Sequence, residues 1–347
     1  MARFDRVYRL VVGQGGSQGV EIVPPLRVAF DIHKNNKKNP NRSRIRVWNL
    51  KASTRQALER PDIRCIFQAG YAEEGGPADV FVGDVLEAYS LYELPDIITV
   101  LELGEGVTAI RDGQVSLGYG RGTGTRQALQ DVAGRMGLTL LMPEDAPHKT
   151  WDNGFSYHGP GRAALDQITR YAGLSWSIQG TTLQVVRTGG STNRQVFDLS
   201  ASSGLIRTPE RVRKGRREGA AQVEDELTRT KKRAGTKTEE VDGWRVRSLL
   251  LPSLIPDDRV KLSSRTVDGV FVVHEIQHVG DTHGGDWVTE MLLAEASAAT
   301  TDKRAQPPAP KTRARQSNAG GDLPLPEPPP DPNEIRNRRW RELAGGV

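Results

Sequence analysis

The stretch GWRVRSLLLPSLIPDDRVKLSSRTVDGVFVVHEIQHVGDTHGGDWVTEMLLAEA, residues Gly243–Ala296, decides how we interpret this chain. Its second half predicts a β-hairpin, because Val270–Val279 is rich in β-branched and aromatic residues and Gly280–Asp286 (GDTHGGD) is a cluster of turn residues. The return segment Trp287–Ala294 alternates between two faces. One face would carry Trp287, Thr289, Met291 and Leu293, and the other Val288, Glu290, Leu292 and Ala294.

A similar pattern occurs earlier in the chain. Val80-Phe81-Val82 has the composition of a strand, and Asp96-Ile97-Ile98-Thr99 begins a return strand. A shift of 190 residues needs no gap and pairs Val80 with Val270, Leu86 with Ile276, Asp96 with Asp286, Thr99 with Thr289 and Leu103 with Leu293. The match predicts an internal duplication of one β-domain, with a chance likeness between strands as the alternative.

Length and composition limit the class of protein. A chain of 347 residues has room for two or three domains with buried cores. No apolar run approaches the roughly 18–20 residues of a transmembrane helix, and the N-terminal segment lacks the features of a signal peptide. The single cysteine, Cys65, excludes an internal disulfide and is expected in the core.

The charge distribution gives little support for nucleic-acid binding. The net charge of +5 is modest for this length, and basic residues gather in Arg207–Lys237 and in the C-terminal tail. A nucleic-acid-binding face would need a basic surface with aromatic side chains or a known motif. Because acidic residues are mixed into the first of these runs, we interpret it as a solvated loop.

The order of patterns along the chain predicts four parts. They are a first β-domain at 1–110, a small α+β domain at 111–194, a second β-domain at 195–297 that contains a charged loop at 211–242, and an extended Pro-rich tail at 298–347. In the first part, Leu50–Arg60 predicts a short helix. In the second, helices at Thr125–Gly137 and Pro160–Gly173 repeat at a shift of 36, and each is followed by a strand.

The end of the tail predicts a docking segment. The last residues, Glu334–Gly346 (EIRNRRWRELAGG), would as a short helix place Ile335, Trp340 and Leu343 together. A tryptophan is unusual in a solvated tail, so we expect these three side chains to bind a partner. The alternative is a tail with no structure of its own.

No pattern of residues predicts catalysis. His274, His278, Asp281 and His283 form the one cluster that suits a metal, but a polar hairpin turn explains them better. The glycines of Ser116–Thr125 (SLGYGRGTGT) lack the G-K-[ST] of a phosphate-binding loop. The adjacent carboxylates Asp257 and Asp258 are expected in a turn without a pocket. We therefore expect no enzyme activity, no catalytic residue, no metal site and no cofactor.

Several segments, taken in order, resemble one family. They are NRSRIRVWNL (Asn41–Leu50), VFVGDV (Val80–Val85), GPGRAALDQITRYAGLSWSIQ (Gly159–Gln179), SGLIRTPE (Ser203–Glu210), LLLPSLIPDDRVKL (Leu249–Leu262) and HVGDTHGGDWVTE (His278–Glu290). Through their order and spacing, residues 1–297 resemble the baseplate hub proteins of tailed bacteriophages, related to the late control protein D group of contractile tails.

The resemblance implies an α+β, β-rich fold, with two similar tube-like β-barrel domains flanking a small α+β domain. It implies a structural homotrimer whose six tube-like domains adapt the hexameric tail tube to the threefold central spike. The genome would pass through a central channel without specific binding. The implied partners are the tail tube protein and the spike. The charged loop at 211–242 and the Pro-rich tail fit the family pattern least, so the binding of other baseplate proteins through the C-terminal tail is expected from the tail sequence itself. The implied location is the virion tail, assembled in the host cytoplasm, with no membrane partner.

Two alternatives remain at this stage. The chain could be another tail-tip module, such as a distal tail or tube-type protein, and would then form hexamers. It could also be a tail-associated cell-wall hydrolase, which would need a pair of carboxylates in a cleft.

Overall fold

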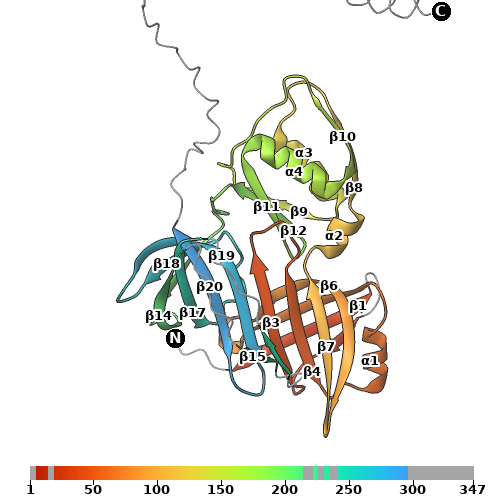
Figure 1. Ribbon diagram of the computed structural model, residues 1–347, viewed down its shortest axis with the longest axis vertical. Coiled ribbons are helices and arrows are strands. Elements are labelled where there is room, and N and C mark those ends of the chain that lie inside the picture. Colours follow the sequence, from red (N-terminus) through yellow and green to blue (C-terminus); the bar gives the residue numbers. More distant parts are fainter. Residues whose placement is uncertain (1–4, 15–18, 214–221, 226–229, 234–240, 296–347) are drawn as a thin grey trace, which may run out of the picture. The chain divides into compact units, whose positions relative to one another are not determined.

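The structure is a computed structural model that describes residues 5–14, 19–213, 222–225, 230–233 and 241–295. Ile335, Trp340, Leu343 and the rest of the predicted docking tail lie outside the described residues. The described part is rich in strands, shown as arrows in Figure 1. The α+β, β-rich fold class predicted from the sequence is therefore confirmed. No helix in the described ranges is long and apolar enough to cross a membrane.

The first β-region is an antiparallel sheet with two short helices. Its strands are β1 (Arg6–Gln14), β2 (Val20–Ile22), β3 (Val28–Asn35), β4 (Arg42–Trp48), β5 (Ile63–Tyr71), β6 (Gly76–Glu93) and β7 (Asp96–Gly104). Their order in the sheet is β3-β4-β7-β6-β5-β1-β2. The expected helix at Leu50–Arg60 is α1 (Ala52–Leu58), and the 3₁₀ turn Ala72–Glu74 and α2 (Val107–Asp112) complete this part. Inward-facing residues such as Phe30, Phe67 and Phe81 form its core.

The second β-region repeats this organisation. Its strands are β13 (Val196–Ser200), β14 (Leu205–Val212), β17 (Gly243–Leu249), β18 (Arg259–Ser263), β19 (Asp268–Asp281) and β20 (Trp287–Glu295). Their order is β14-β17-β20-β19-β18, with β13 parallel to β18. β14 enters the predicted charged loop at 211–242, and the loop also contains a two-stranded ladder of β15 (Gln222–Asp225) and β16 (Thr230–Arg233).

The two regions share one sheet, which the sequence did not predict. β19 pairs antiparallel with β3, so that Val279 lies opposite Asp31 and His278 opposite Ile32. This junction joins the strands of both regions into a 13-stranded sheet. This pairing joins residues about 250 positions apart, so it cannot be predicted from a local sequence pattern.

The five-strand units match strand by strand. In chain order, β3, β4, β5, β6 and β7 correspond to β14, β17, β18, β19 and β20, and both sets occupy the same order in the sheet. Matching sequences lie on matching strands, since Arg44–Trp48 (RIRVW) is in β4 and Arg245–Leu249 (RVRSL) is in β17. The internal repeat expected from the hairpins is therefore visible in the topology.

One part of the predicted repeat register is wrong by two residues. β6 has a β-bulge between Val85 and Glu87, and β19 has one between Val273 and Glu275. Leu103 lies opposite Val85 and Leu293 lies opposite Val273, which keeps the 190-residue shift for the return strands. The bulges themselves are 188 residues apart, because the second hairpin loop is two residues longer. Leu86 therefore corresponds to His274, not to Ile276.

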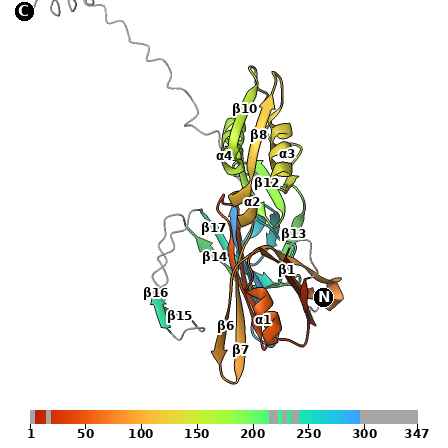
Figure 2. The ribbon, with the colours of Figure 1, turned by 90° about the vertical axis from the view of Figure 1, so that its right-hand side faces the viewer.

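The middle region is a separate α+β core. Its elements are β8 (Gln114–Tyr119), α3 (Thr125–Arg135), β9 (Thr139–Leu141), β10 (Phe155–Pro160), α4 (Gly161–Ala172), β11 (Leu174–Gln179) and β12 (Thr182–Arg187). Figure 2 shows β8 and β10 side by side, with α3 and α4 next to them. Both expected helix–strand repeats are present. Pro160 is the N-cap of α4 rather than its first residue, and Gly173 ends it at a φ of 72°.

Candidate assembly surface

Both β-cores lie on the same face of the shared sheet. Ile32 belongs to the first core and is directly opposite His278 on β19. Ile276, two residues before His278 and on the same side of the strand, belongs to the second core. We call the other side the open face. It is formed by alternate residues of β3, β4, β7, β17, β19, β20 and the outer half of β6, Glu87–Glu93.

The open face carries more carboxylates than arginines. Its described strand residues include eight carboxylates (Asp31, Glu87, Glu93, Asp96, Glu102, Glu275, Asp281 and Glu290) and five arginines (Arg42, Arg44, Arg46, Arg245 and Arg247). Arg27, just before β3, adds a sixth. The chain as a whole has a net charge of +5, so this face departs from the overall charge of the molecule.

Ion pairs already engage several of these arginines. Arg44 Nε lies 2.6 Å from Glu102 Oε1 on the neighbouring strand. Arg247 contacts Glu290 at 3.3 Å and Asp286 at 2.5 Å. Cross-strand pairs of opposite charge are favourable at directly opposed positions. A guanidinium held by carboxylates has less capacity left for a phosphate.

Asp31 lies at the internal junction and remains ionised. Partial burial acts to raise the pKa of Asp31, but hydrogen bonds from His33 and Gln277 and the charge of Arg44 outweigh it, so its pKa is lowered. Gln277 on β19 donates to Asp31 on β3 over 2.7 Å, which fixes one strand against the other. The junction is thus held by side chains as well as by backbone pairing.

A small apolar cluster covers one end of the open face. It contains Ala29, Trp48, Ile98 and Val100, with Tyr89 and Leu91 packed against it. Arg27 lies over the Trp48 ring at 4.2 Å and pairs with Asp281 of the second region at 2.7 Å. This cluster therefore lies where the two β-regions meet and extends to β6.

Several strand segments of the shared sheet pair on one side only within the described residues, and two of them are the outer half of β6 and β14. The outer half of β6 pairs with β7 on one side only, and β14 pairs with β17 only. Six strands of the sheet separate β6 from β14, and β5, β1 and β2 continue the sheet beyond β6. Leu86, Tyr92 and Leu94 around the β6 edge are 39%, 69% and 89% exposed. An open apolar edge is a template for pairing with another chain.

The two adjacent carboxylates lie at the turn expected from the sequence, but both side chains are buried. Asp258 is fully buried and accepts hydrogen bonds from Thr192 and Arg194, both at 2.8 Å. Asp257 is 4% exposed and accepts from Asn36 of the β3–β4 turn at 2.8 Å and from Gln184 of β12 at 2.7 Å. Asp257 thus ties the three regions together.

We expect Asp257 to make the protein less stable as the pH rises from about 4 to about 6. Burial raises the pKa of Asp257 to about 6, with smaller opposing effects from Asn36 and Gln184. Between the ordinary carboxyl pKa and this value the folded state binds more protons than the unfolded state, so its advantage disappears as the pH increases. The full effect is on the order of 3 kcal/mol.

The measurement is chemical denaturation of the wild type and of Asp257→Asn between pH 4 and pH 8. The unfolding free energy of the variant, relative to the wild type, should rise across this window. The same change at the exposed Asp198 controls for the loss of one negative charge. A constant difference between wild type and Asp257→Asn would contradict the assignment.

The four residues considered as metal ligands, His274, His278, Asp281 and His283, do not form a metal site in the structure. His278 is buried and its Nδ1 is 2.9 Å from the Thr289 hydroxyl, while His283 Nε2 is 3.2 Å from the carbonyl of Pro25. Asp281 pairs with Arg27, and His274 occupies the bulge of β19. No group of three or more His, Cys, Asp or Glu side chains that could hold a metal occurs in the described ranges. Cys65 is in the core, and burial raises its pKa.

These features define a fold in which one chain carries two copies of a sheet-forming unit and an inserted α+β domain. No family model and no curated protein matches the chain. Solved structures do. The 43 kDa tail protein of prophage MuSo2 from Shewanella oneidensis is 12% identical, with 83% of this chain and 97% of that chain covered and a TM-score of 0.53.

Two further structures have the same fold. A tail protein from Neisseria meningitidis is 15% identical over 83% of this chain and 96% of that one, with a TM-score of 0.51. The E. coli c3393 protein is a type VI secretion component described as structurally similar to the T4 tail proteins gp27 and gp5. It is 8% identical over 83% of this chain and 77% of that one, with a TM-score of 0.52. The resemblance to phage tail and baseplate proteins is therefore confirmed as a shared fold.

Proposed function

We propose that this protein is the structural baseplate hub of a phage tail. The observation that carries the proposal is the duplicated five-strand unit, joined into one sheet in which two different strand edges, the outer half of β6 and β14, lack a partner among the described residues. Two different edges on one molecule favour head-to-tail association, which closes into a ring when the rotation fits. The tail proteins that share the fold support this setting.

The ring would contain three copies. Two units per chain then give six similar units, which match the symmetry of a hexameric tail tube on one side and a threefold spike on the other. In this proposal residues 1–110 and 195–297 form the tube-like domains, residues 111–194 form the insertion, and residues 298–347 form the tail. The location is the virion tail, assembled in the host cytoplasm without a membrane partner.

The open face would line the channel. The cores occupy its other side, so a closed ring leaves the open face toward the centre. Its excess of carboxylates and its paired arginines offer phosphates little attraction, which suits passage of the genome without specific binding. The role is mechanical, and no catalytic step belongs to it. Asp257 and Asp258 are buried and hydrogen-bonded, which disfavours them as the carboxylate pair of a hydrolase.

The partners proposed are the tail tube protein, the central spike and other baseplate proteins. That the other baseplate proteins bind Ile335, Trp340 and Leu343 of the tail stays a prediction from the sequence.

The mass of the full chain in solution tests the hub proposal. Light scattering over a range of concentrations, with electron microscopy of the particles, should show rings of three copies with a central hole. Rings of six copies would overturn the hub in favour of a tube-type or distal tail module. A chain that stays monomeric at the highest concentration would count against ring formation.

A further inference from the structure

We propose that the outer half of β6 in one copy pairs antiparallel with β14 of the next copy, in the register that joins β19 to β3 inside the chain. This inference rests on the proposed ring and specifies the contact that closes it. The argument uses the internal junction as a template for the contact between copies.

The first step is the equivalence of β6 and β19. Each is a long strand whose first half pairs with β5 or β18 and whose second half pairs with β7 or β20. In both strands the pairing partner changes near a β-bulge, and a glutamate follows the bulge, Glu87 in β6 and Glu275 in β19. When β6 and β19 are aligned at their bulges, Leu91 of β6 corresponds to Val279 of β19. The outer half of β19 is covered by β3, whereas the outer half of β6 is open.

The second step is the equivalence of β3 and β14. Asp31 of β3 lies opposite Arg44 of β4, and Glu210 of β14 lies opposite Arg245 of β17. Arg44 and Arg245 are themselves equivalent, because they face Glu102 and Leu292, which the 190-residue shift relates. Glu210 therefore corresponds to Asp31.

The register follows from these two steps. Inside the chain Val279 lies opposite Asp31, so Leu91 should lie opposite Glu210 of the next copy. Two residues along, Tyr89 should lie opposite Val212. β14 has its own irregularity between Ile206 and Glu210, which includes Pro209, so the pairing should be strongest from Glu210 to Val212.

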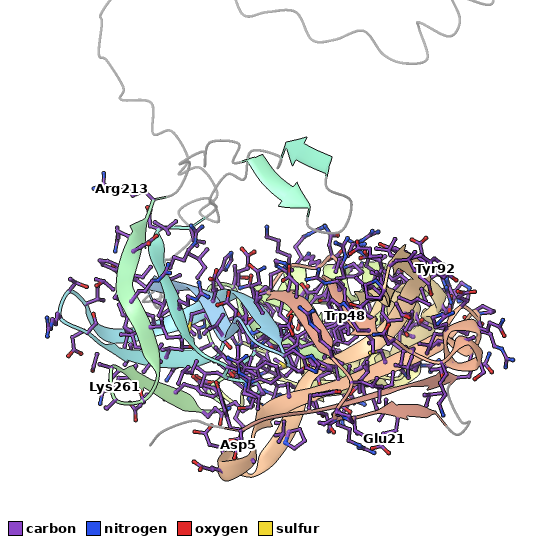
Figure 3. All side chains as sticks on the ribbon, turned by 90° about the horizontal axis from the view of Figure 1, so that it is seen from below. Asp5, Glu21, Trp48, Tyr92, Arg213 and Lys261 are labelled. Carbon is purple, nitrogen blue, oxygen red and sulfur yellow. The ribbon has the colours of Figure 1, made fainter. Side chains whose placement is uncertain are left out.

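The positions of the edges exclude pairing of β6 with β14 inside one chain, so their pairing needs a second copy. β14 and β6 are separated by six strands of the same sheet. Figure 3 shows Tyr92, at the end of β6, and Arg213, just after β14, at opposite ends of the molecule. The pairing would cover the β6 edge, where Tyr92 and Leu94 are 69% and 89% exposed. It would also extend the apolar cluster that already contains Tyr89 and Leu91.

The test is cysteine cross-linking of the full chain. Leu91→Cys combined with Glu210→Cys should give covalent dimers and trimers under mild oxidation, because directly opposed residues lie within disulfide reach. The control pair is Leu91→Cys with Arg211→Cys, since a shift of one residue turns the second side chain to the other face. We expect at least about tenfold more cross-linked product from the first pair. The parent chain has one buried cysteine, Cys65, and serves as the blank.

Each outcome decides something. Trimers that cross-link at 91 and 210 but not at 91 and 211 support the register. Trimers that cross-link at neither pair, or better at 91 and 211, overturn the register but leave the hub proposal standing. Absence of trimers in the unmodified chain overturns the hub proposal itself.

A second variant pair does not depend on oxidation. Leu91→Glu would place two carboxylates opposite each other, and we expect trimer dissociation to increase roughly fivefold per contact. Adding Glu210→Lys should restore the trimer by creating an opposite-charge pair. Equal dissociation of the single and double variants would contradict the proposed contact.

Discussion

Glu105→Ala is expected to lower the free energy of unfolding by about 3–5 kcal/mol, because it leaves a buried lysine without its counter-charge. Glu105 is fully buried, and one carboxylate oxygen lies 3.1 Å from Lys34 Nζ, whose side chain is 7% exposed. Asn41 donates to the other oxygen over 3.1 Å. Lys34 lies on β3 opposite Ile276 of β19, so the network lies directly under the internal junction.

The charge of Lys34 also acts on the buried His278. Burial, followed by the positive charges of Lys34 and His33, lowers the pKa of His278 to about 3. Lys34 is almost fully buried and needs the opposite charge of Glu105, since isolated charges are costly in a protein interior.

Denaturant unfolding of three variants would measure the effect. Glu102→Ala removes a glutamate from a partly exposed pair with Arg44 and should cost about 1 kcal/mol or less. Lys34→Met combined with Glu105→Leu should recover much of the loss, because apolar pairs can replace buried ion pairs. If Glu105→Ala costs no more than Glu102→Ala, the network does not hold the junction.

The local part of the fold could be predicted from the sequence. Alternation and turn residues located the β19–β20 hairpin, and apolar periodicity with Gly173 located α4. These signals are short-range, since each depends on residues a few positions apart. The repeat was detectable for the same reason, because both hairpins carry similar strands.

The assembly surface could not be predicted in the same way. A β-bulge adds one residue and reverses the faces that follow, so simple alternation along Val270–Val279 fails at His274. The pairing of β19 with β3 depends on the whole chain and leaves no local mark. One usable signal was overlooked, namely the paired arginines of RIRVW and RVRSL, which identify β4 and β17 as equivalent strands.

Asp257 and Asp258 show the same limit. A Pro-Asp-Asp sequence is typical of an exposed turn, and Asp257 does adopt a turn conformation with a φ of 64°. Its burial comes from Asn36 and Gln184, which other regions of the chain supply. Tertiary contacts therefore bury Asp257, and its hydrogen bonds connect the second β-region to the first β-region and to the middle region.

Charge reversal on the open face is expected to convert the protein into a DNA-binding ring. Glu102→Lys with Glu290→Lys would remove two carboxylates from each chain, add two lysines and remove the contacts that Arg44 and Arg247 make with Glu102 and Glu290. Because the proposed ring repeats the change three times, many cations would line one channel. Affinity for duplex DNA should rise by about 100-fold or more at low salt and fall steeply with added salt, as counterion release requires.

Fluorescence anisotropy with a labelled duplex, titrated between low and physiological salt, measures this change. The matched control is Glu59→Lys with Glu73→Lys, which gives the same net charge at exposed positions away from the open face. We expect the control to bind about as weakly as the wild type. Equal binding by both variants would show that net charge alone acts, and tight binding by the wild type would contradict a channel that lets the genome pass. A large difference between the variants would assign the open face to the channel wall.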